Sequence, residues 1–287
     1  MNWLKVEVTV SSEAIEALSP AMLSLSPSGI QVDSKDGTAT LIIYVPESYP
    51  LENIQATLKT ALDKISSEGL NAEPADIKVS SISDENWIEN YRKYFKPIQI
   101  GRFLIKPSWE EIQALPDEIV IQLDPGLAFG TGSHPTTEGC LIFLQEFIYG
   151  GETVLDLGTG SGILAIAAAK LGAGRAIAID NDPQAIEVAK KNAAENSVAG
   201  KINFMVEDFA DFKPARVDLL VANLTAFLII KLLSDIVRKL EGLRIFVASG
   251  ITVGQKGPVL EALKENGFVA EKILDTGEWT TLVSRLG

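Results

Sequence analysis

The fold of this chain is decided by Val154-Leu155-Asp156-Leu157-Gly158-Thr159-Gly160-Ser161-Gly162. The apolar run from Thr153 to Leu157 predicts a buried strand, and the glycines after it predict a tight turn before a helix that begins near Ile163. Glycine allows the backbone to approach a ligand closely, and the N-terminus of a helix presents unpaired N–H groups to an anionic group. We therefore expect this turn to cradle a cofactor.

Strand and helix patterns alternate along the rest of the C-terminal half. The expected strands are 176–179, 202–206, 217–222, 243–249, 268–274 and 279–284, and the expected helices are 163–171, 183–196, 226–240 and 257–266. Repeated β-α units predict a parallel, doubly wound, Rossmann-like α/β sheet with right-handed crossovers. In such a sheet a ligand binds beyond the carboxyl ends of the strands.

Residues 1–84 predict a separate, smaller α+β domain. Alternating or continuous apolar residues predict strands at 3–10, 29–33, 38–45 and 77–82. Amphipathic patterns predict one helix that Ser11 or Ser12 caps and that carries Ile15, Leu18, Met22 and Leu25, and a second helix at about 51–67. This β-α-β-β-α-β order is that of a ferredoxin-like domain, a fold that does not itself name a function. The segment holds 5 Lys and no Arg against 12 Asp or Glu, a net charge of -7. An acidic docking surface for a basic protein follows more readily than an RNA-binding sheet.

An aromatic linker, residues 85–110, is expected between this domain and a catalytic domain of residues 111–287. Trp87, Tyr91 and Tyr94 share one helical face, and Pro97 ends the helix. Strands are expected at 98–107 and 119–123, and the loop 124–137 then leads into a helix of about Thr137 to Phe147 that a threonine caps. This loop is either a structural loop or a ligand loop that closes over the cofactor.

Composition limits the class of protein. The 287 residues, 46% hydrophobic and 22% charged, suit a globular protein with two domains. A net charge of -13 argues against a nucleic-acid partner. One cysteine, Cys140, and one histidine, His134, leave little for a disulfide, a metal site or Ser-His-Asp chemistry, and fit a reducing cytoplasm. Residues 1–10 predict a strand and no signal peptide, and no apolar run reaches the ~20 residues of a membrane span. We expect a cytoplasmic monomer without a membrane or nucleic-acid partner.

Polar residues follow successive strands of the predicted sheet and indicate the cofactor. The turn has the pattern Gly158-x-Gly160-x-Gly162, which differs from the G-x-G-x-x-G of dinucleotide sites. Asp180 ends the next strand, where a carboxylate accepts from ribose hydroxyls, and Asp208 follows the third strand, where it can accept from an adenine amino group. Asn223 follows the fourth strand. An adenosine ligand fits nicotinamide enzymes and methyltransferases alike, and the lack of a second phosphate-binding element favours the latter.

The arrangement resembles class I S-adenosylmethionine-dependent methyltransferases, and the whole chain resembles the ribosomal protein L11 methyltransferases. The most specific marker is Asp124-Pro-Gly-Leu-Ala-Phe-Gly-Thr-Gly-Ser-His-Pro-Thr-Thr137, supported by Leu155-Asp-Leu-Gly-Thr-Gly-Ser-Gly162 and Val221-Ala-Asn-Leu-Thr-Ala226. The resemblance implies methylation of the N-terminal α-amine and lysine side chains of a basic large-subunit ribosomal protein. It also implies that the N-terminal domain recognises this substrate.

Site residues follow from the resemblance and from the strand ends together. The expected cofactor-binding residues are Thr137, Asp156, Gly158, Gly160, Asp180, Asp208, Asn223 and Leu224, and the expected catalytic residue is Asn223. Family members often carry isoleucine where Leu224 stands. No metal site is expected, and the cofactor expected is S-adenosyl-L-methionine.

The chemistry requires a neutral amine, although the reference pKa is ~10.4 for lysine and ~8 for an α-amine. We expect that desolvation in a closed cleft lowers the pKa of the amine and that Asn223 orients the amine or anchors the cofactor. Two alternatives remain open. One is methylation of a glutamine amide in a translation factor, although such enzymes carry Asn-Pro-Pro-Tyr where this chain has Asn223-Leu-Thr-Ala. The other is a non-catalytic protein that senses the cofactor.

Overall fold

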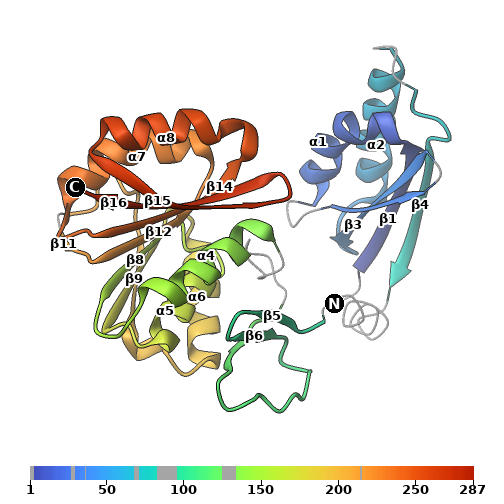
Figure 1. Cartoon of the computed structure of the whole chain (residues 1–287). Helices are drawn as coiled ribbons and strands as arrows, with labels where there is room; N and C mark the ends of the chain where they lie inside the picture. Colours follow the sequence, from blue (N-terminus) through green and yellow to red (C-terminus); the bar gives the residue numbers. More distant parts are fainter. Residues whose placement is uncertain are drawn as a thin grey trace. The chain divides into compact units, whose positions relative to one another are not determined.

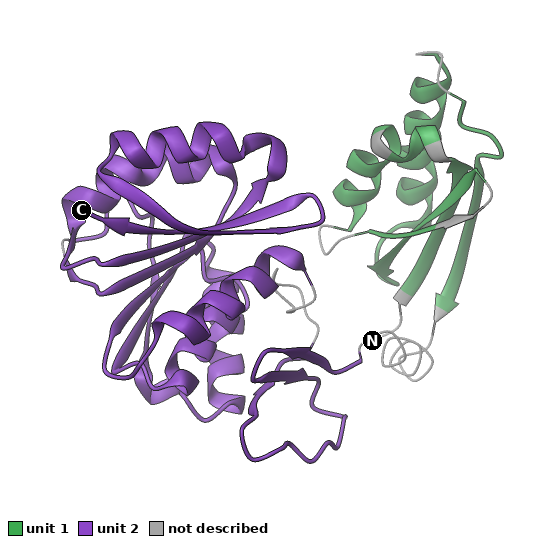
Figure 2. Cartoon of the chain, viewed as in Figure 1, with its two compact units in different colours: residues 1–95 green, residues 96–287 purple. Residues whose placement is uncertain are grey.

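The computed structural model divides the chain into two compact units, residues 1–95 and 96–287 (Figure 2). It describes residues 3–26, 30–35, 37–67, 71–82, 96–124, 134–213 and 215–287. Most of the predicted linker helix (residues 87–95 of 87–97) and most of the predicted ligand loop (residues 125–133 of 124–137) lie outside the described residues. The domain boundaries expected at residues 84 and 110 stay a prediction. Residues 98–106 contribute two strands to the second unit.

The first unit is an antiparallel four-stranded sheet with two helices (Figure 1). Its elements are β1 (Trp3–Ser11), α1 (Ile15–Leu25), β2 (Gln31–Lys35), β3 (Thr38–Pro46), α2 (Leu51–Ser67) and β4 (Asp76–Ile82). The strand order is β2-β3-β1-β4. Alternate residues of β1, among them Val6 and Val8, are buried in one cluster with Leu18 of α1 and Leu58 of α2. The period-two and helical patterns of the sequence therefore predicted this core correctly.

A seven-stranded sheet forms the centre of the second unit. Its strands are β8 (Thr153–Leu157), β9 (Arg175–Asp180), β10 (Ile202–Val206), β12 (Leu219–Asn223), β14 (Ile245–Thr252), β15 (Phe268–Thr276) and β16 (Trp279–Leu286). They are ordered β10-β9-β8-β12-β14-β16-β15. The first five are parallel as predicted, whereas β16 runs antiparallel to both of its neighbours. An all-parallel sheet was the wrong expectation here, because the two residues between β15 and β16 can form only a hairpin.

Helices cover both faces of this sheet (Figure 1). One face carries α4 (Pro135–Phe147), α5 (Ile163–Leu171) and α6 (Pro183–Glu195), and the other carries α7 (Ala226–Lys239) and α8 (Lys256–Glu265). Two apolar clusters result, one on each side of the strands. Short strands complete the unit: β5 (Ile98–Ile100), β6 (Phe103–Lys106) and β7 (Ile119–Gln122) form one small sheet, and β11 (Ala215–Arg216) pairs with β13 (Leu240–Glu241).

The only cysteine, Cys140, is fully buried on α4, as its apolar surroundings in the sequence suggest. Burial raises the pKa of its thiol far above the ordinary value. Among the described residues, no helix is both long enough and apolar enough to cross a membrane.

Candidate functional site

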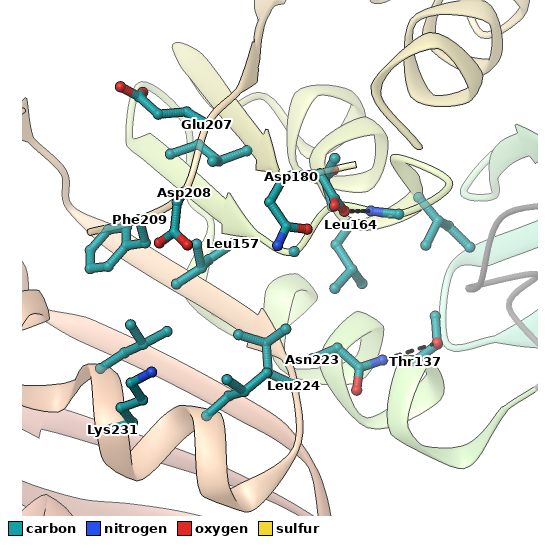
Figure 3. A pocket seen from close by; sticks show the side chains of 18 residues that line it. Thr137, Leu157, Leu164, Asp180, Glu207, Asp208, Phe209, Asn223, Leu224 and Lys231 are labelled. Carbon is teal, nitrogen blue, oxygen red and sulfur yellow. Dashed lines mark hydrogen bonds between the residues drawn. The ribbon is translucent and has the colours of Figure 1, made fainter. Parts of the chain in front are cut away.

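A cavity of about 320 Å³ lies beyond the carboxyl ends of the central strands (Figure 3). Its walls come from the turn after β8, the ends of β9 and β12, the loop after β10, and helices α4, α5 and α7. The lining residues are Thr137, Leu157, Gly158, Thr159, Gly160, Ile163, Leu164, Ile179, Asp180, Asn181, Glu207, Asp208, Phe209, Asn223, Leu224, Leu228, Lys231 and Leu232. This volume and mixed lining suit a small organic ligand.

The turn after β8 requires glycine for two separate reasons. Gly158 has φ +76°, a value that residues with a side chain seldom adopt, and a Cβ placed there would lie 2.6 Å from Cδ2 of Leu224. Gly162 has φ +82°, and its Cβ would lie 2.9 Å from that of Ala189. The turn is therefore packed on one side against the floor of the cavity and on the other against α6.

Most backbone N–H groups of the turn itself have partners within the protein, so they are not free to bind an anion. Gly158 and Thr159 donate to the carbonyl oxygen of Ile179 at 2.9 Å each, and Gly162 donates to Thr159 at 2.8 Å. Gly160 donates to the carboxylate of Asp180 at 3.0 Å. Because these backbone donors already have partners within the protein, the role of the glycines is to shape the cavity wall and not to donate hydrogen bonds to a ligand.

Asp180 is held in place by the backbone on both sides. Its Oδ2 accepts from Gly160 and its Oδ1 accepts from the backbone of Asp182, both at 3.0 Å. Each carboxylate oxygen can accept a further hydrogen bond, and the side chain points into the cavity (Figure 3). An acceptor fixed in this way suits a pair of neighbouring hydroxyl groups.

Asp156 is 0% exposed and is not among the residues that line the cavity, so the structure does not bring this expected cofactor residue to the cavity surface. Its Oδ2 accepts from the hydroxyl of Thr159 at 2.6 Å and from the backbone of Ala165 at 3.0 Å. Burial raises the pKa of the carboxyl to about 7, against the opposing effect of these two hydrogen bonds. Asp156 therefore links the turn to the first residues of α5 and holds this part of the cavity wall in place without facing the cavity itself.

Asp208 and Phe209 occupy the far end of the cavity, in the loop after β10 (Figure 3). The Oδ1 of Asp208 accepts from the backbone of Ala210 at 2.8 Å, which turns the loop, and the carboxylate remains exposed. Lys231 of α7 lies across this end of the cavity from Asp208. The two residues give the site opposite charges on facing walls.

Asn223 lies at the other end of the cavity and contacts the start of α4. Its Nδ2 donates to the hydroxyl of Thr136 at 3.1 Å and to that of Thr137 at 3.4 Å (Figure 3). A threonine N-cap was the wrong expectation for α4, because His134 is the N-cap and Pro135 is the first residue of the helix. Since Nδ2 is directed to the helix, the carbonyl oxygen of the Asn223 side chain is the atom left for a ligand.

His134 orders this hydrogen-bond chain. Its Nδ1 lies 2.7 Å from the Thr136 hydroxyl and accepts from the Thr136 backbone at 3.3 Å. Burial lowers the pKa of His134, which favours the neutral ring with Nδ1 as acceptor. The Thr136 hydroxyl then donates to His134 and accepts from Asn223. The ring of His134 also contacts Trp279 edge-on, with centroids 5.0 Å apart.

Seven of the eight residues that the sequence predicted for the cofactor line one cavity, and Asp156 is the exception. Thr136, Phe209 and Lys231 were missed. Thr136 is 1% exposed and lies next to Thr137, which was expected. Its role could be recognised only from the structure, in which its hydroxyl, at the start of α4, accepts from Asn223. Lys231 lies on a helix whose exposed face showed no motif.

The sheet order, the reversed strand β16 and the cavity at the strand ends define a class I methyltransferase domain, which takes its methyl group from S-adenosyl-L-methionine. A model of the ribosomal protein L11 methyltransferase (PrmA) family matches residues 2–286. The chain belongs to this family.

Two individual relatives align with nearly the whole chain, and a solved structure aligns with about two thirds of it. The ribosomal protein L11 methyltransferases of Caldicellulosiruptor saccharolyticus and Enterococcus faecalis are each 35% identical to the chain and cover 99% of it, with 100% and 98% of their own lengths aligned. A solved structure of ribosomal protein L11 methylase from Lactobacillus delbrueckii subsp. bulgaricus has a TM-score of 0.62 at 35% identity, and covers 66% of this chain and 98% of that chain. These matches favour the first of the three functions considered from the sequence.

Proposed function

We propose that this protein methylates the N-terminal α-amine and lysine side chains of ribosomal protein L11. The observation that carries the proposal is the convergence of Asp180, Asp208 and Asn223 on one cavity at successive strand ends, in a chain that matches this family from end to end. The residues fit the methyl donor chemically: a fixed carboxylate for the ribose, a second carboxylate for the adenine amino group, and an amide near the methionine end.

The chain's own residues then hold and orient the reacting groups. Bound S-adenosyl-L-methionine supplies an electrophilic methyl group on a sulfonium. The free carbonyl oxygen of Asn223 accepts from the substrate amine and turns the nitrogen lone pair toward the site of transfer, while Thr136 and Thr137 fix the amide. Leu224 and Leu228 exclude water, and the low polarity of these walls favours the neutral amine. In this proposal the amine gives its proton to solvent before the nitrogen enters the apolar part of the cavity, and the residues described as lining the cavity include no histidine.

The N-terminal unit serves as the substrate-recognition domain in this proposal. Its antiparallel order β2-β3-β1-β4 with two helices on one face supports the ferredoxin-like assignment. The charge of -7 over residues 1–84 supports an electrostatic attraction for a basic ribosomal protein. We propose further that the protein acts as a cytoplasmic monomer without binding nucleic acid directly.

The experiment is methyl transfer from a radiolabelled donor to large-subunit proteins taken from cells that lack the modification. One labelled basic protein, identified as ribosomal protein L11 by mass spectrometry with methyl groups on amines, is expected. Label in RNA only, in a glutamine amide, or in no product would exclude the proposal.

The role of Asp180 has its own test. We expect Asp180→Ala to abolish detectable calorimetric binding of S-adenosylhomocysteine while the far-ultraviolet circular dichroism stays unchanged, because both the ribose acceptor and the partner of Gly160 are lost. Asp211→Ala, an exposed position outside the cavity, is the matched control and should bind normally. Unchanged affinity in Asp180→Ala would remove this residue from the site.

A further inference from the structure

Lys239, the last residue of α7, is a buried lysine that the proposed chemistry does not use. Its side chain is 6% exposed. Its ammonium donates to the carbonyl oxygen of Phe209 at 2.7 Å and also to that of Ala210. It lies 5.4 Å from the centroid of the Phe209 ring. Among the described residues no carboxylate forms an ion pair with it, so the two carbonyl groups and the ring are what balance this buried charge.

The two carbonyl groups belong to the loop that forms the far end of the cofactor cavity. Phe209 lines the cavity, and Asp208, directly before it, presents the carboxylate proposed for the adenine amino group. Asp208 also accepts from the backbone of Ala210, so the loop is closed locally by Asp208 and anchored to α7 by Lys239. Phe209 stacks on Phe212 with centroids 5.6 Å apart, which places the anchored segment on the apolar core.

The anchor joins two parts of the chain that are about thirty residues apart. Hydrogen bonds from a charged donor are stronger and more directional than neutral ones. If the two carbonyl groups moved away from the buried ammonium, its charge would be left unpaired in an apolar core, and this cost holds the acceptors in place. The backbone directly after Asp208 therefore has little freedom. The carboxylate is consequently held at one place along the cavity wall.

We infer that Lys239 is a positioning residue that fixes the Asp208 loop and thereby sets the selectivity of the site for adenine. This inference rests on the proposed cofactor site. Adenine offers an amino donor at C6 to the carboxylate of Asp208. Hypoxanthine has a carbonyl oxygen at C6, which a carboxylate repels, and its donor is the neighbouring N1–H, which a carboxylate reaches only by moving. A carboxylate held in place discriminates strongly between the two bases, and a mobile one turns away from the wrong base and discriminates weakly.

The experiment compares calorimetric affinities for S-adenosylhomocysteine and for S-inosylhomocysteine, its analogue with hypoxanthine. In the full-length wild type we expect a preference of at least about tenfold for the adenine compound. Lys239→Met keeps the apolar stem and removes the charge. It should weaken binding of the adenine compound by about tenfold and reduce the preference to about threefold or less.

Two controls separate positioning from general damage. Arg238→Met removes a cation from the same helical turn, where the side chain is exposed and pairs with Asp235 instead of the loop. Ile236→Val weakens the packing of α7 at a residue 1% exposed. Both should keep the wild-type preference. Should Lys239→Met fail to fold, Lys239→Gln, which can still donate to one carbonyl, is the deciding variant and should give an intermediate preference.

The outcomes are distinct. A wild-type preference in Lys239→Met or Lys239→Gln overturns the role of Lys239 and leaves the cofactor site intact. An equal loss for both ligands, matched by Ile236→Val, overturns it also, because the effect is then structural. A wild-type protein that binds neither ligand overturns the proposed cofactor site itself.

Discussion

The hydroxyl of Thr136 is the link that decides how Asn223 faces the cavity. Replacing Thr136 by valine keeps the shape of the side chain but removes the acceptor for the Asn223 amide and the donor to His134. We expect kcat to fall about three- to tenfold, the effect of one ordinary hydrogen bond, with little change in the affinity for S-adenosylhomocysteine. Steady-state kinetics with ribosomal protein L11 measures this.

Serine at the same position is the matched control, because it restores the hydroxyl without the methyl group. Thr136→Ser should recover most of the lost kcat. Equal losses in the valine and serine variants would show that packing of the buried methyl group matters here and hydrogen bonding does not.

The buried carboxyl of Asp156 should make the free energy of unfolding depend on pH. The pKa of its buried carboxyl is raised from 3.8 to about 7, so between these values the folded protein holds a proton that the unfolded chain has released. A rise in pH through this window therefore favours unfolding, by up to about 1.4 kcal/mol per pH unit from this group. Asp156→Asn cannot titrate. The free energy of unfolding of the wild type should fall relative to this variant from pH 5 to pH 7 and level off above.

Urea unfolding of both proteins at pH 5, 6, 7 and 8 makes the comparison, and the circular dichroism of each folded baseline confirms that the two start from the same fold. A constant difference between the two free energies across this range would mean that Asp156 is ionised in the folded protein at pH 5.

Strands β12 and β14 pair side by side, and Leu224, the residue directly after β12, lies close against Gly250 of β14. Gly250 has φ +84°, and a Cβ there would lie 2.8 Å from the carbonyl carbon of Leu224. The backbone of Leu224 also donates to Ser249 at 3.0 Å, so the segment cannot move aside without losing this bond. We expect Gly250→Ala to lower the free energy of unfolding by at least about 2 kcal/mol and to weaken cofactor binding, because Leu224 floors the cavity.

Gly257→Ala is the matched glycine control, since nothing lies within 4 Å of a Cβ at that position on α8. A small gain in stability, up to about 1 kcal/mol, is expected there. Chemical denaturation gives both values. If Gly250→Ala is as stable as the wild type and binds S-adenosylhomocysteine equally well, the close approach of the two strands has no bearing on the site.

The sequence predicted those elements whose apolar pattern is regular. Helix α2 and strands β8 and β10 match the predicted bounds, because their patterns begin and end at clear polar or glycine residues. The reversal of β16 was missed although its signal, a two-residue connection with Gly277, is present in the sequence. The cap of α4 was misassigned because a histidine seldom caps a helix, and its Nδ1 does so only in one protonation state.

The site residues likewise fall into some that could be predicted from the sequence and some that could not. Asp180, Asp208 and Asn223 were predictable, since parallel strands bring their carboxyl ends to one edge of the sheet. The anchoring role of Lys239 was not predictable, because its partners are backbone carbonyl groups about thirty residues away. Every residue carries such a carbonyl group, so the pattern of side chains in the sequence does not indicate a hydrogen bond of this kind.

At the scale of the whole molecule, the chain forms two compact units with separate cores. Removing residues 1–95 should leave the affinity for S-adenosylhomocysteine unchanged, since every residue that lines the cavity belongs to the second unit. Methylation of ribosomal protein L11 should fall by at least about tenfold, because the acidic unit no longer attracts the substrate. Calorimetry and the radiolabel assay give the two values.

A short amine substrate without the rest of the ribosomal protein is the control, and the truncated and full-length proteins should methylate it at equal rates. Equal rates with the intact ribosomal protein as well would contradict the recognition role of the first unit.

The solitary Cys140 makes this protein well suited to site-specific labelling. A thiol that is fully buried and whose pKa is raised by burial reacts slowly with maleimides, because the thiolate is the reactive form. Cysteines introduced at the exposed positions Thr60 of α2 and Ser234 of α7 would therefore carry a fluorophore pair without removal of the native cysteine. Energy transfer between the dyes would then follow the distance between the two units as cofactor and substrate are added, one turnover at a time.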